Sequence, residues 1–136
     1  MAKLVLAVDD EIPTLKLIQK ALEAHGLEVA TAANGAEALL AIPHRRPDLV
    51  ILDVMMPVLD GFQTLRSLRE NEATQHLPVI MLTARREDKD VTRGWATGAD
   101  FYLTKPFDIK ELVAVVDRLL EVSAEADLPA EPDGPT

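Results

Sequence analysis

The stretch KLVLAVDDEIPT, residues 3–14, joins a run of apolar residues directly to three acids. The run Leu4–Val8 has no polar alternation, which is typical of a strand buried on both faces of a parallel sheet. Asp9, Asp10 and Glu11 follow at once. Neighbouring carboxylates at the end of a buried strand repel one another and lose solvation, so an interaction that compensates this cost is expected.

Strand-like and helix-like segments alternate along the rest of the chain. This alternation predicts an α/β fold, a doubly wound five-stranded parallel sheet with five helices, in which the three most apolar strands are central. The expected strands are Leu4–Val8, Leu27–Ala32, Leu49–Asp53, Pro78–Thr83 and Phe101–Thr104. The expected helices contain Leu15–Leu22, Gly35–Ile42, Phe62–Leu68, Val91–Gly98 and Ile109–Leu120.

Composition narrows the range of functions. The chain has 136 residues, a net charge of -9, 48% hydrophobic residues and no cysteine. One globular domain is expected, and broad electrostatic binding to nucleic acid or to anionic membranes is disfavoured. Disulfides and cysteine-ligated zinc are excluded. The first apolar run is too short for a signal peptide or a membrane span, so a cytoplasmic location is expected.

The end of the sequence differs from the rest. Segment Ser123–Thr136 contains three prolines, four acids and no basic residue. Such a segment buries too little apolar surface to offset the entropy lost on ordering. We therefore expect one folded domain over residues 1–122 and a disordered, acidic, proline-rich tail or linker over residues 123–136.

The carboxyl ends of the expected strands carry side chains suited to chemistry. Asp9 and Asp10 follow the first strand, Asp53 ends the third, Thr83 ends the fourth and Lys105 follows the fifth. Because parallel strands end at one edge of a sheet, these side chains are expected at one crevice. Carboxylates this close stay ionised when a cation lies among them, and oxygen ligands favour Mg2+. Mg2+, lysine and threonine together can hold a phosphoryl group, with Asp53 as the nucleophile.

The motifs VDDE, LVILDVMMPVLDGF, VIMLTA and GADFYLTKPF resemble, in this order, those of the response-regulator receiver domain of two-component signalling. The resemblance covers residues 3 to about 121. It implies a flavodoxin-like fold with strand order 2-1-3-4-5. It also implies that Asp53 accepts a phosphoryl group from a histidine kinase or a phosphotransfer protein.

The resemblance implies a metal site as well. Asp10, Asp53 and the backbone carbonyl of Met55 would bind Mg2+, and Asp9 would act mainly through water. The apolar Met55 side chain cannot orient an attacking water, so we expect slow autodephosphorylation. The chain is accordingly expected not to be an enzyme beyond self-catalysed phosphorylation and this slow hydrolysis.

The remaining implied roles concern a switch. Thr83 and Lys105 would contact the phosphoryl oxygens, and the peptide bond between Lys105 and Pro106 would be cis. Thr83 and Tyr102 would couple the phosphoryl group to the surface made by the fourth helix, the fifth strand and the fifth helix. A downstream output protein or domain would read that surface, and a phosphorylation-dependent dimer is a further option. Direct contact with nucleic acid or with a membrane is not expected.

Three other interpretations stay open at this point. The acids after the first strand can simply favour the N-terminus of a helix. A degenerate receiver would serve as a docking module without phosphorylation. A haloacid-dehalogenase-like phosphatase would use the same aspartate chemistry, but it needs an acid two residues after the nucleophile, where this chain has Met55.

Overall fold

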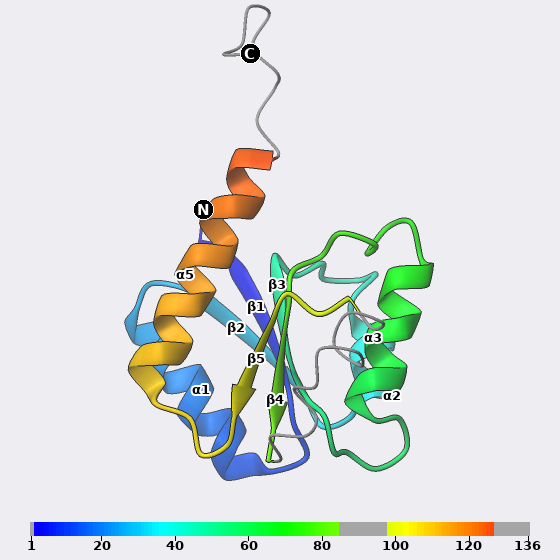
Figure 1. Cartoon of the computed structure of the whole chain (residues 1–136), viewed down its shortest axis with the longest axis horizontal. Coiled ribbons are helices and arrows are strands. Elements are labelled where there is room, and N and C mark those ends of the chain that lie inside the picture. Colours follow the sequence, from blue (N-terminus) through cyan, green and yellow to red (C-terminus); the bar gives the residue numbers. More distant parts are fainter. Residues whose placement is uncertain (1, 85–97, 127–136) are drawn as a thin grey trace, which may run out of the picture.

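The computed structural model of the chain describes residues 2–84 and 98–126. Its five strands form one parallel sheet in the order β2-β1-β3-β4-β5 (Figure 1). This is the strand order that the resemblance implied, so the predicted doubly wound fold is confirmed. The strands are β1 (Leu4–Val8), β2 (Glu28–Ala32), β3 (Leu49–Asp53), β4 (Val79–Thr83) and β5 (Phe101–Thr104).

Burial follows the position of each strand in the sheet. Every residue of β1, β3 and β4 is buried, whereas the edge strands β2 and β5 contain exposed and partly buried residues as well as buried ones. The three most apolar strands are therefore the central ones, as predicted. A strand covered on both faces has no solvent side, which explains why these strands are apolar except for Asp53 and Thr83 at their carboxyl ends.

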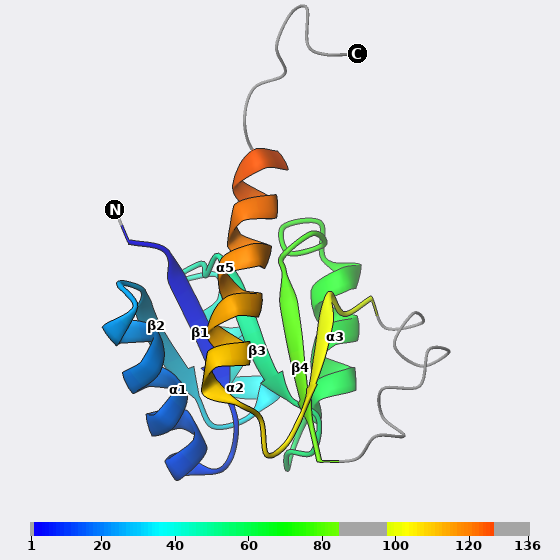
Figure 2. The ribbon, with the colours of Figure 1, turned by 60° about the vertical axis from the view of Figure 1, so that its left-hand side comes forward.

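Helices cover both faces of the sheet. They are α1 (Ile12–Ala24), α2 (Gly35–Ala41), α3 (Gly61–Glu70) and α5 (Ile109–Ala126). The apolar stripes of α1 and α5 share one core cluster, and those of α2 and α3 share the other. Figures 1 and 2 show these two helix pairs on opposite sides of the sheet. Among residues 2–84 and 98–126, every helix is too short or too polar to span a lipid bilayer.

A glycine brings α3 close to the end of β3. Asp60 caps α3 by a capping box with Gln63, and the Gly61 N–H donates to the Val54 carbonyl at 2.9 Å. A Cβ atom at Gly61 would lie 2.4 Å from the Asp53 carbonyl oxygen. Only glycine leaves room for this approach, so the close packing of α3 against the end of β3 depends on Gly61.

The structure differs from the predicted helices at two places. Helix α5 runs to Ala126, so residues 123–126, which were assigned to the disordered tail, are helical. Alanine and glutamate at positions 124–126 are strong helix formers, and they extend a helix that is already packed. Residues 91–97 of the predicted helix Val91–Gly98 lie outside the described part of the chain. The tail from residue 127 onward also lies outside it. Gly98 itself lies in a turn with φ of 78°, so the prediction that it is helical is wrong.

Candidate functional site

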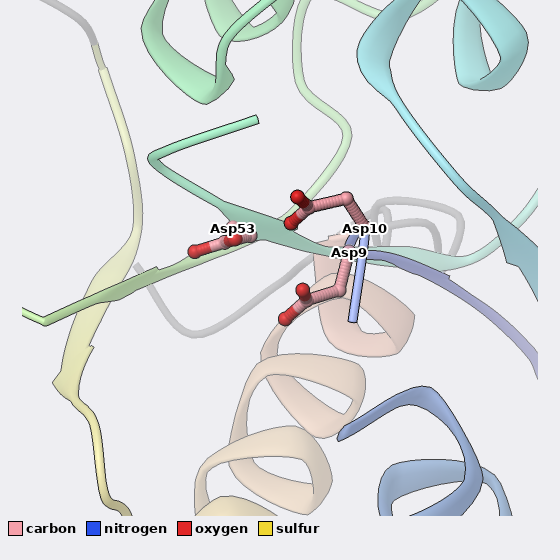
Figure 3. Close-up of side chains that lie close together, drawn as sticks. All are labelled: Asp9, Asp10 and Asp53. Carbon is pink, nitrogen blue, oxygen red and sulfur yellow. The ribbon is translucent and has the colours of Figure 1, made fainter. Parts of the chain in front are cut away.

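Three carboxylates meet where two neighbouring strands end. Asp9 and Asp10 follow β1, and Asp53 is the last residue of β3, which pairs with β1. One oxygen of each side chain lies within 4.8 Å of the others (Figure 3). Asp9 is 1% exposed and Asp53 5%, whereas Asp10 is exposed. Three oxygen donors at this spacing fit a hard divalent cation.

Lys105 contributes the positive charge of the site. Its ammonium nitrogen lies 2.8 Å from Asp9 Oδ2 and 3.3 Å from Asp53 Oδ1. The Lys105 backbone N–H donates to the Thr83 carbonyl at 2.6 Å, which extends the β4–β5 pairing to the site. The peptide bond between Lys105 and Pro106 is cis, as the resemblance implied. Four sequence-predicted residues, Asp9, Asp10, Asp53 and Lys105, thus lie together.

Burial and neighbouring charges shift the ionisation of the site. The pKa of Asp53 is raised from 3.8 to about 6, mainly by burial and then by the charge of Asp9, while Lys105 opposes the rise. Burial alone would lower the pKa of Lys105, but its hydrogen bond to Asp9 and the charges of Asp53 and Asp9 outweigh that effect and raise it. The carboxylates outnumber the ammonium group, so a cation among them would relieve their repulsion.

Asp9 is held more firmly than the sequence indicated. Its Oδ1 accepts the Glu11 backbone N–H at 2.9 Å, and its Oδ2 accepts the Lys105 ammonium. Both oxygens of this buried carboxylate are therefore occupied by donors. The predicted role of Asp9 through water, and the predicted Met55 carbonyl ligand, stay predictions.

The two predicted switch residues lie on neighbouring strands. Thr83 is buried at the end of β4 and is paired in register with Thr104 of β5. Tyr102 is partly buried and packs against the core cluster that α2 and α3 share. The segment between these strands, residues 85–97, lies outside the described part of the chain, so the coupling of the two residues stays a prediction.

Sequence reasoning missed a contact of Glu11. It treated Glu11 as an acid near a helix start, whereas the Glu11 side chain reaches the Lys105 ammonium, with Oε1 3.2 Å from Nζ. Glu11 is the N-cap of α1, but its side chain accepts no capping hydrogen bond. The sequence did contain one signal for this contact: glutamate is not among the preferred N-cap residues, so its presence at that position was not explained by capping.

Val58 adopts a backbone conformation that is unfavourable for its residue type. In the loop between β3 and α3 it has φ of 71°, and its side chain is 80% exposed. A β-branched residue at positive φ crowds its own backbone, which costs about 1–2 kcal/mol. No burial of the side chain offsets this cost.

We expect Val58→Gly to stabilise the protein. Relief of the strain outweighs the larger conformational entropy of glycine in the unfolded chain, and a net gain of about 0.5–1 kcal/mol follows. Urea denaturation measures the free energy of unfolding. Val58→Ala is the control, since it keeps a Cβ atom and should gain much less. A glycine variant less stable than the alanine variant would show that the loop is not strained at this residue.

Comparison with known proteins gives consistent matches. The family model of the response regulator receiver domain matches residues 5–117. The phosphate regulon transcriptional regulatory protein PhoB of Rhizobium meliloti is 46% identical over 116 residues, covering 85% of this chain and 51% of that protein. The chain spans about half the length of the curated relatives it matches.

Solved structures show the same fold. The chemotaxis protein CheY4 of Vibrio cholerae is 36% identical with a TM-score of 0.82, covering 88% of this chain and 99% of that one. The receiver domain of the sensor histidine kinase PA1611 of Pseudomonas aeruginosa is 30% identical with a TM-score of 0.80, covering 89% and 99%. In that receiver domain a magnesium ion is coordinated in the active-site cleft.

Proposed function

The chain belongs to the response regulator receiver domain family of two-component signalling, and from this membership we propose that Asp53 is its phosphoacceptor. The observation that carries the proposal is the position of Asp53, which ends a central strand between two further carboxylates and the Lys105 ammonium. The Lys105 ammonium supports the charge of this buried nucleophile, and a cation bound among the three carboxylates would offset their mutual repulsion. The direct test is the mass of the intact chain after incubation with a phosphoryl donor.

The transfer itself needs little from the protein beyond placement and charge. A carboxylate oxygen of Asp53 attacks the phosphorus of a phosphohistidine, a bond from that oxygen to phosphorus forms, and the phosphorus–nitrogen bond breaks with its electrons going to the imidazole. Lys105 stands beside Asp53 and can donate to an oxygen of the transferred group. Thr83, buried at the end of the adjacent strand, is proposed to donate to another.

We propose Mg2+ as the metal of the carboxylate group. Asp10 and Asp53 would be direct ligands together with the Met55 carbonyl, and Asp9 would act through water. The grouping of the three carboxylates supports this proposal, as does the similar receiver domain of PA1611, which coordinates this ion. When bound, Mg2+ supplies positive charge that neutralises phosphoryl oxygens during in-line transfer. Asp10 is the most accessible of the three carboxylates, and its role would be to complete the site toward solvent.

Mg2+ is expected to raise the melting temperature of the chain, and Asp10→Asn is expected to lose most of that shift. Binding to the folded state alone contributes about 2.7 kcal/mol at a hundredfold excess over the dissociation constant. Asp108→Asn is the matched control, because Asp108 is also exposed and precedes α5 at the same edge of the sheet. If the melting temperature of wild type does not change when Mg2+ is added, the proposed metal site is wrong.

Chemistry beyond phosphoryl acceptance is not proposed. The side chain two residues after Asp53 is the exposed Met55, which can neither protonate a leaving group nor orient a water. This favours slow autodephosphorylation and disfavours a phosphatase of the haloacid-dehalogenase type. The complete set of carboxylates and lysine also disfavours a degenerate receiver that only docks.

The partners follow from the proposed chemistry. A histidine kinase or phosphotransfer protein, reached in the cytoplasm, would supply the phosphoryl group. Thr83 and Tyr102 would convert its arrival into a change of the surface that includes β5, α5 and the segment before β5, and an output protein or domain would read that change. With a net charge of -9 the chain itself is not expected to bind nucleic acid.

A further inference from the structure

Glu11 contacts the Lys105 ammonium although it is not one of the three grouped carboxylates. The Glu11 side chain is 61% exposed and that of Lys105 is 17% exposed. As the N-cap of α1, Glu11 makes no capping hydrogen bond with its side chain. Its backbone forms the start of the helix: the Glu11 N–H donates to Asp9, and the Glu11 carbonyl accepts the Leu15 N–H. Among residues 2–84 and 98–126, Lys105 is the side chain that the Glu11 carboxylate contacts.

The Lys105 ammonium donates hydrogen bonds to Asp9 and Glu11 and forms an ion pair with Asp53. An ammonium group has three N–H donors. Three carboxylates lie around it, Asp9 at 2.8 Å, Glu11 at 3.2 Å and Asp53 at 3.3 Å. A phosphoryl oxygen beside Asp53 would therefore compete with these carboxylates for the Lys105 ammonium.

Glu11 differs from the other two partners in what it can release. Asp9 and Asp53 belong to the group that can hold a divalent cation, which would compete with the ammonium for their oxygens and repel it. Asp9 is also buried, so losing its contact with Lys105 would leave the Asp9 carboxylate unpaired and away from water, which is costly. Glu11 lies outside that group and faces solvent, so water replaces its contact at little cost.

We propose that Glu11 is a positioning residue that holds the Lys105 ammonium in the unphosphorylated site and competes for it with the phosphoryl oxygens. The proposal rests on the function proposed above. In the metal-loaded site Glu11 is the carboxylate that keeps Lys105 near the start of α1. Arrival of the phosphoryl group exchanges this exposed ion pair for a hydrogen bond beside Asp53. Removing the charge of Glu11 therefore favours the phosphorylated arrangement.

The test is Glu11→Gln, which keeps the backbone N–H and nearly the same side-chain shape. Beryllofluoride, a mimic of the bound phosphoryl group, is titrated at saturating Mg2+ and followed by amide spectra. The dissociation constant is expected to fall about two- to fivefold, as for the loss of one exposed ion pair that opposes binding. Glu111→Gln is the matched control, an exposed acid in the first turn of α5 at the same edge of the sheet. Its dissociation constant should match wild type.

A second readout needs neither metal nor ligand. The Cε and Nζ resonances of Lys105 are expected to shift in metal-free Glu11→Gln and to stay in place in Glu111→Gln, because only Glu11 contacts the ammonium. Equal or weaker beryllofluoride binding by Glu11→Gln overturns the inference, as does equal tightening in both variants. If wild type binds no beryllofluoride with Mg2+, the proposed function itself fails; if wild type binds and Glu11→Gln does not differ, only the role of Glu11 fails.

Discussion

With acetyl phosphate and Mg2+, the wild-type chain is expected to gain one phosphoryl group, and Asp53→Asn is expected to gain none. The amide has no charged nucleophilic oxygen, so no acyl phosphate can form at that position. Asp9 is not expected to replace it as the acceptor, since both of its oxygens are occupied by donors. Intact-mass measurement after a short incubation gives the number of groups added.

Asp48→Asn is the matched control for this experiment. Asp48 directly precedes β3, at the opposite end from Asp53, and its carboxylate accepts the Leu4 N–H at 2.8 Å, which an asparagine oxygen can still do. This variant should label like wild type. No added mass in wild type would contradict the assignment of an acceptor, and persistent labelling of Asp53→Asn would move the acceptor to another residue.

In metal-free buffer, Asp53→Asn is expected to be more stable than wild type above pH 6, and the difference should shrink as the pH falls toward 4. Burial raises the pKa of Asp53 to about 6 from 3.8. A raised carboxyl pKa means that the folded state binds the proton more tightly than the unfolded state does. The stabilising contribution of Asp53 is therefore fully present below its pKa in the unfolded state. It is lost as the pH rises through its pKa in the folded state. The neutral amide avoids that loss, which is about 2–3 kcal/mol at neutral pH.

Denaturation in urea between pH 4.5 and pH 8, with a chelator present, measures the difference in unfolding free energy. Saturating Mg2+ should reduce or reverse the advantage of the variant, because the ion stabilises the ionised site of wild type. Asp48→Asn again serves as the control variant. A difference between Asp53→Asn and wild type that is constant across this range would mean that burial does not disfavour the Asp53 charge.

Much of the architecture could be predicted from the sequence because it depends on short-range geometry. Continuous apolar runs place β1, β3 and β4 in the centre of the sheet, since residues of both faces must be buried there. Parallel connectivity brings the ends of these strands to one edge whatever the details of the loops, so Asp53, Asp9 and Asp10 had to meet. Two helix ends carry residues with a matching local preference, Asp60 at the N-cap of α3 and Gly26 after α1, whose φ is 89°.

The chemistry of the site, in contrast, was decided by tertiary structure. The ion pair of Glu11 with Lys105 joins residues 94 positions apart, and no local period or motif specifies which carboxylate a long lysine side chain reaches. The raised pKa of Asp53 comes from burial and neighbouring charge, which exist only once the strands are packed. Val58 is similar, since the loop between two fixed elements imposes its positive φ against its own preference. Contacts of a few ångströms depend on side-chain rotamers and loop paths, and these are set by the assembled fold.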